Sequence, residues 1–134
     1  DVNACTKSMT TPIHWAADRG YKDVVEMLIL NGANINAIDR EGKSPLHNSV
    51  KYGQKDVAEM LILNGCNVNA LDEYSITPLY IAVQNGDKDL VKLLISKGAD
   101  VNAVTKYGIT PLTLATILKQ KDVMQLLTSQ GAKE

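Results

Sequence analysis

A period of 33 residues constrains the fold of this chain more than any other feature. The four prolines lie at positions 12, 45, 78 and 111. Counted from each proline, a Lys-Asp pair and an apolar block followed by glycine return at the same distance in every unit. A fixed period between about 20 and 50 residues is typical of solenoids, propellers and other repeat arrays. We therefore expect a series of stacked, equivalent units.

Each unit opens with a signal for the start of a helix. Thr or Ser precedes every proline, which places a capping hydroxyl before the one helical position that tolerates proline. Gly20, Gly53 and Gly86 should end the first three of these helices after about two turns. In the fourth unit Lys119 replaces this glycine.

A second helix is expected at each Lys-Asp pair, because an aspartate in the first turn complements the helix dipole. Apolar residues at helical spacing predict one buried stripe, formed in the first two units by Val24, Met27, Leu28, Val57, Met60 and Leu61. The segments between units alternate briefly and then turn at Asp or Gly, so they predict short β-hairpin arms. Met9 and Ser75 replace the arm glycine, and a left-handed Ser75 would cost about 1 kcal/mol.

Stacking is required because one pair of short helices cannot bury its apolar faces alone. The small residues Ala16, Ser49, Ala82 and Ala115 suit the close approach of stacked helices.

The composition argues against several classes of function. The 134 residues carry 14 basic and 15 acidic side chains, for a net charge of -1, whereas nucleic-acid and anionic-membrane surfaces need excess Lys and Arg. No apolar run approaches the roughly 20 residues that cross a bilayer. Two cysteines and no glycosylation sequon give no sign of secretion. We expect an intracellular protein, in the cytoplasm or the nucleus.

No arrangement of residues predicts catalysis, a metal or a cofactor. His14 and His47 occupy the same position in successive units, where we expect them to bond neighbouring backbone groups. A metal site needs at least three ligands, and the other two units carry Tyr80 and Thr113 at this position. The chain also lacks the glycine-rich motifs that bind phosphate.

The two cysteines are not expected to form a disulfide. Cys5 and Cys66 lie two units apart, which stacking converts to roughly 16–20 Å, too far for a bridge. Cys66 fills a small-residue position and is expected to behave as a small core hydrophobe, whereas Cys5 should be more exposed.

The opening segments such as Thr-Pro-Ile-His-Trp-Ala-Ala (11–17), the segment Gly-Ala-Asp-Val-Asn-Ala (98–103) and the 33-residue period resemble ankyrin repeats over nearly the whole chain. The resemblance implies a mostly α solenoid of stacked helix-turn-helix units joined by short β-hairpin loops. Within a single domain, 1–134, the expected repeats are 11–43, 44–76, 77–109 and 110–134, the last acting as a C-terminal cap. Residues 1–10 match the tail of a preceding repeat, so the chain resembles an excerpt of a longer array.

Ankyrin repeats usually bind proteins on their concave side, which hairpin tips and first helices form. The resemblance therefore implies a non-catalytic protein–protein interaction scaffold, working as a monomeric module without nucleic acid or membrane insertion. Two alternatives stay open. In the first, the chain is the targeting or substrate-recruiting arm of a larger enzyme, ubiquitin-ligase adapter or channel. In the second, it is a mechanical spacer.

The repeat register assigns residues to this concave side. The predicted protein-binding residues are Trp15, Arg19, Arg40, Glu41, Lys43, Lys51, Tyr52, Tyr74, Ile76, Tyr107 and Ile109. The Tyr and Ile pairs at the third and fourth units are expected to include a hot spot, while Arg40, Glu41, Lys43 and Lys51 steer the partner. The alternative is that tip residues pack on the neighbouring tip.

One modification follows from the resemblance alone. Asn102 ends a Leu-x5-Asp-Val-Asn pattern that begins at Leu94, and this asparagine can be hydroxylated in ankyrin repeats. The alternative is that Asn102 satisfies backbone groups of the hairpin.

Overall fold

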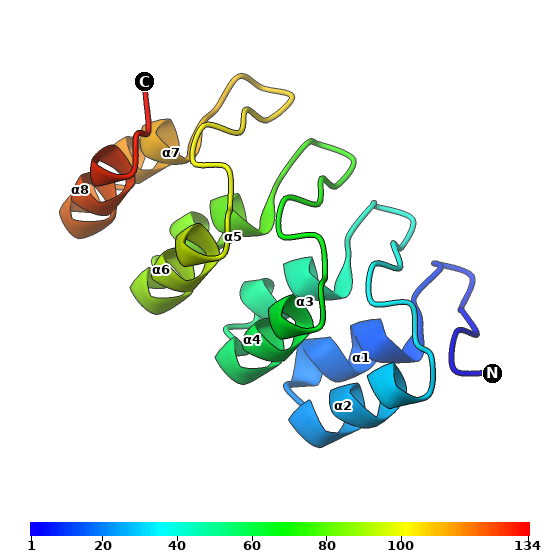
Figure 1. Ribbon diagram of the computed structural model, residues 1–134. Helices are drawn as coiled ribbons and strands as arrows, with labels where there is room; N and C mark the ends of the chain where they lie inside the picture. The colour runs from blue at the N-terminus through cyan, green and yellow to red at the C-terminus, as the bar shows by residue number, and fades with distance from the viewer.

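The computed structural model describes all 134 residues and contains eight α-helices and no β-strand (Figure 1). The helices form four pairs: α1 (Pro12–Arg19) with α2 (Lys22–Leu30), α3 (Pro45–Lys51) with α4 (Lys55–Leu63), α5 (Pro78–Asn85) with α6 (Lys88–Ser96), and α7 (Pro111–Ile117) with α8 (Lys121–Ser129). Every predicted helix start is confirmed. None of the helices has the length and apolar character needed to cross a membrane.

The pairs stack in two rows. The first helices α1, α3, α5 and α7 contact one another in sequence, and α2, α4, α6 and α8 form the second row. We call the second row the outer helices. Figure 1 shows the connecting loops projecting from the stack beyond the ends of the helices. We call the surface between the loop tips and the first helices the inner surface.

The core is aliphatic and runs the length of the stack. Ala16, Ser49, Ala82 and Ala115 are fully buried, which confirms that small residues let the first helices approach closely. Large side chains such as Leu79 fill the space between layers. Because each layer packs mainly on its neighbours, the stability of the stack is close to a sum of repeat and interface contributions.

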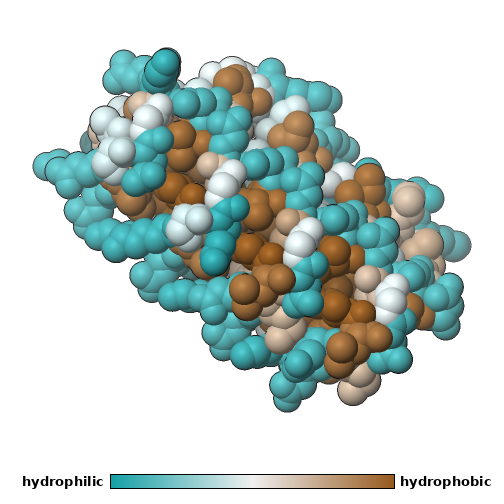
Figure 2. All heavy atoms as spheres, viewed as in Figure 1, coloured by the Kyte–Doolittle hydropathy of each residue, from teal (hydrophilic) through white to brown (hydrophobic).

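The predicted buried stripe is wrong for part of α2. Val24 and Met27 are exposed, and Val25 is the buried residue of this helix. In α4 the equivalent Val57 is buried because α2 packs against α4. No helix covers the corresponding side of α2, and hydrophobic residues gather over α2 and α4 in Figure 2.

The predicted β-hairpin arms form hairpin-shaped loops without strands. Successive tips are joined by single backbone hydrogen bonds, such as Glu73 N–H to the Glu41 carbonyl oxygen (2.8 Å) and Lys106 N–H to the Tyr74 carbonyl oxygen (3.0 Å). A strand needs a ladder of such bonds, so the arms are better described as a row of linked turns.

Three residues other than glycine adopt the left-handed backbone that the repeat requires. Met9, Ser75 and Lys119 have φ of 62°, 59° and 57°, which confirms the conformation considered for Ser75. Gly42 occupies the position of Ser75 one repeat earlier, with φ of 78°.

We expect Ser75→Gly to raise the free energy of unfolding by about 0.5–1 kcal/mol, because glycine adopts positive φ without a steric cost. Urea denaturation would measure the change. The matched control is Gly42→Ala, which should destabilise the protein because its Cβ would lie 3.0 Å from the Glu73 backbone nitrogen. A decrease in stability for Ser75→Gly would show that the serine backbone is unstrained.

Candidate protein-binding groove

A hollow of about 250 Å³ lies on the inner surface between two loop tips and the helices α3 and α5. We call this hollow the groove. It is lined by Glu41 and Lys43 from one tip, Asp72, Tyr74 and Ile76 from the next tip, Lys51 from α3, and Ile81, Gln84 and Asn85 from α5. The fold therefore brings together, in one concave site, several of the residues predicted to bind a partner.

A buried carboxylate shapes the tip beside the groove. Asp72 Oδ1 accepts hydrogen bonds from the backbone N–H groups of Tyr74 and Ile76, both at 2.9 Å. Asp39 and Thr105 make the equivalent pairs of bonds in the neighbouring tips. These three residues were not among those predicted from the sequence. A detectable signal was a short polar side chain three residues before each left-handed position of the tip.

Two buried histidines attach the tips to the first helices. His47 Nδ1 accepts from the Ser44 N–H (3.1 Å), and its Nε2 lies 2.8 Å from the Ile76 carbonyl oxygen. This arrangement requires the neutral ring with its proton on Nε2. Burial lowers the pKa of His47. His14 makes the same contacts one repeat earlier, with Nε2 2.9 Å from the Lys43 carbonyl oxygen, so the structural interpretation of both histidines is confirmed.

Two tyrosines form the aromatic part of the inner surface. The rings of Tyr74 and Tyr107 stack with centroids 6.2 Å apart, so the tips do pack on one another. Both residues nevertheless stay accessible, with 42% and 72% of their area exposed. Ile76 and Ile109 are instead partly buried against the core. A partner would therefore meet mainly tyrosine at these tips.

The charged residues of the groove differ in their availability. Glu41 and Lys43 form an ion pair at 2.6 Å, which lowers the pKa of Glu41 and raises the pKa of Lys43. Lys51 belongs to neither salt bridge of the structure, and its Nζ lies 5.2 Å from the centroid of the Tyr52 ring. Lys51 is thus an unpaired cation at the edge of the groove.

The remaining predicted binding residues lie outside the groove. Trp15 lines a separate hollow of about 390 Å³ beside α1, where Arg19 sits 4.6 Å from its ring centroid. Tyr21 contacts the same ring edge-on, with centroids 5.4 Å apart. Arg40 is exposed on its tip, and its backbone N–H donates to the Ser8 carbonyl oxygen. Trp15, Arg19 and Arg40 therefore do not line the groove.

Asn102 belongs to a column of asparagines that link successive repeats. Its Nδ2 donates to the Gly131 carbonyl oxygen (3.2 Å), and its Oδ1 accepts from the Lys133 N–H (2.8 Å). Asn3 and Asn69 make the same two kinds of bond. Asn102 therefore satisfies backbone groups, while its hydroxylation stays a prediction.

Neither cysteine forms a disulfide. Cys66 is buried, and this burial raises the pKa of its thiol to about 11, so the reactive thiolate is disfavoured. Cys5 is exposed and unpaired. No group of three or more His, Cys, Asp or Glu side chains is placed to hold a metal ion.

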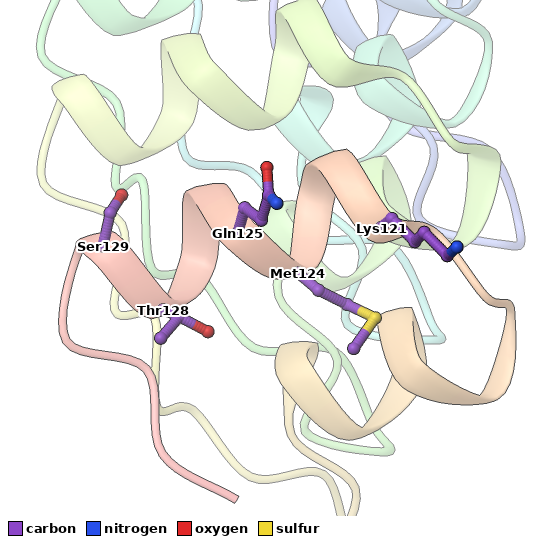
Figure 3. A pocket seen from close by; sticks show the side chains of 5 residues that line it. All are labelled: Lys121, Met124, Gln125, Thr128 and Ser129. Carbon is purple, nitrogen blue, oxygen red and sulfur yellow. The ribbon is translucent and has the colours of Figure 1, made fainter.

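A larger hollow, of about 550 Å³, lies against α8 and makes a weaker candidate. Its five lining residues are Lys121, Met124, Gln125, Thr128 and Ser129. Figure 3 shows that all five side chains come from this one helix, so no second element supplies groups that converge on a ligand. Binding sites usually combine an apolar wall with a few convergent polar groups, which the groove provides and this hollow does not.

Comparison with models of protein families gave a match. A family model described as ankyrin repeats (3 copies) matches residues 1–72 and 61–134. No curated protein matches the chain.

Proposed function

The chain belongs to the ankyrin-repeat family, and on that premise we propose that it is a non-catalytic interaction module that holds a protein partner in the groove. Ankyrin repeats are generally protein–protein interaction modules, and their fold is typically non-catalytic. The observation that carries the proposal is that the groove collects Glu41, Lys43, Lys51, Tyr74 and Ile76 in one concave site.

The mechanism is presentation of a preformed surface. The tip between Asp72 and Ile76 is held by the two hydrogen bonds that the Asp72 side chain accepts and by the contact of His47 with the Ile76 carbonyl oxygen. A backbone hydrogen bond also links it to the preceding tip. Little ordering of the loops is then needed when a partner docks, which lowers the entropic cost of binding. A few anchors can dominate the affinity under these conditions.

The exposed anchors are the stacked Tyr74 and Tyr107, because tyrosine supplies a large contact area and loses little side-chain entropy. Lys51, which forms no ion pair, supplies a positive charge in the same groove as Tyr74. A partner segment that carries an apolar or aromatic side chain and a carboxylate fits this combination. The chain acts as a monomer inside the cell, and its two unpaired cysteines suit a reducing compartment.

The proposal predicts that Tyr74→Ala/Tyr107→Ala weakens partner binding by at least about tenfold, because both rings are removed from the inner surface. The partner would first be captured from lysate of the source cells and identified by mass spectrometry. Its affinity for the purified chain would then be measured by calorimetry.

Lys92→Ala is the matched control, because Lys92 is exposed on the outer helix α6 and forms no salt bridge. Urea denaturation would confirm that each variant is folded. Equal affinities for the wild type and the tyrosine variant would remove the groove from the proposal.

A further inference from the structure

The two most exposed aliphatic side chains of the molecule are not part of the groove lining. Leu30 and Leu63 are the last residues of the outer helices α2 and α4, and they expose 80% and 76% of their area. They occupy the same position in adjacent repeats. Figure 2 shows hydrophobic residues gathered over these two helices. We call Leu30 and Leu63 the outer leucine pair.

The fold does not require leucine at these positions. The equivalent residues of the third and fourth repeats are Ser96 and Ser129, which end their helices in the same way. The position of Leu63 within the stack does not account for its exposure either. It lies in a repeat with neighbours on both sides, since α4 comes between α2 and α6 in the stack (Figure 1), and it is still mostly accessible.

Carboxylates accompany the leucines. Glu26 and Glu59 each lie four residues before a leucine of the pair, so each sits one turn away on the same helix face. Both are exposed, and neither forms a salt bridge. The equivalent residues of the other repeats are Lys92 and Gln125. An acidic and apolar combination is therefore confined to the first two repeats.

The spacing of the pair matches one particular kind of partner. Packed helices lie about 8–10 Å apart, and a helix rises 1.5 Å per residue, so that seven residues span about 10 Å. A helix laid across α2 and α4 can therefore place side chains i and i+7 on the two leucines. A stable dimer buries roughly 800 Å² and about 20–30 residues on each partner, whereas this surface consists of two leucines and the residues beside them.

We propose that the outer leucine pair, together with Glu26 and Glu59, is a second docking surface that binds an amphipathic helix of another protein. This helix carries large aliphatic residues seven positions apart, flanked by Lys or Arg. The surface lies on the outer helices and works independently of the groove. Apolar contact supplies affinity, and the unpaired carboxylates select a basic helix over an acidic one.

The test uses two synthetic helical peptides that share leucines at i and i+7 but carry either lysines or glutamates beside them. Fluorescence anisotropy should show the lysine peptide binding at least about tenfold more tightly than the glutamate peptide. Leu30→Ser/Leu63→Ser installs the serines found in the other repeats and should remove this binding. Glu26→Lys/Glu59→Lys should reverse the preference between the two peptides.

Three kinds of result would overturn the proposal. The first is equal binding of both peptides by the wild type or unchanged binding by the serine variant. The second is a comparable loss of binding in Tyr74→Ala/Tyr107→Ala, which would place the peptide in the groove. The third is that the wild type sediments as a dimer and Leu30→Ser/Leu63→Ser sediments as a monomer. That result would assign the surface to a second copy of the chain.

Discussion

Leu94→Ala is expected to lower the free energy of unfolding by about 3 kcal/mol. Leu94 is fully buried on α6, and removing a buried leucine side chain loses its transfer free energy and leaves a cavity. A domain of this kind is stable by only about 5–15 kcal/mol. Urea denaturation followed by circular dichroism would measure the loss.

Leu63→Ala is the matched control, because it makes the same chemical change on the neighbouring outer helix. Leu63 is mostly exposed, so we expect a change within about 0.5 kcal/mol. Similar losses for the two variants would mean that Leu63 is covered in solution. That result would also contradict the docking surface proposed for the outer leucine pair.

The order of elements could be predicted from the sequence because local signals specify it. A hydroxyl residue followed by proline begins each first helix, and left-handed residues close the helices. The exposure of Val24 and Met27 could not be predicted in the same way. Periodicity identifies apolar positions on a helix, whereas burial depends on whether a neighbouring helix covers them, as α2 covers Val57.

The candidate site was only partly predictable for a related reason. Repeat register places Tyr74, Ile76, Tyr107 and Ile109 on equivalent tips, but it does not say which side chains remain accessible. The structure distinguishes the two residue types, because the isoleucines pack on the core and the tyrosines stay exposed. The roles of Asp72 and Thr105 depend on turn geometry within the tip, which the apolar pattern does not encode.

His47→Thr is expected to lower the free energy of unfolding at pH 7.5 by about 2–3 kcal/mol. The variant leaves a cavity and removes one of the two donors to the Ile76 carbonyl oxygen, which also accepts from the Asp72 N–H (3.2 Å). The fourth repeat already carries threonine at this position, where Thr113 N–H donates to the Thr110 hydroxyl. The helix start should therefore survive, and the loss should come from the missing link to the tip.

The pH dependence of this loss gives a sharper test. Burial lowers the pKa of folded His47, with the nearby Asp72 and Asp39 carboxylates opposing the shift, whereas the unfolded residue titrates near its ordinary pKa of about 6.5. Below that pH the unfolded chain binds a proton that folded His47 does not, so the wild type loses stability as the pH falls from about 7 to 5. His47→Thr lacks this contribution, and His14 is common to both proteins. The difference in the free energy of unfolding between the wild type and His47→Thr should therefore be smaller at pH 5 than at pH 7.5. A difference that widens instead would mean that His47 is charged in the folded protein, so that Nδ1 carries a proton and cannot accept from the Ser44 N–H.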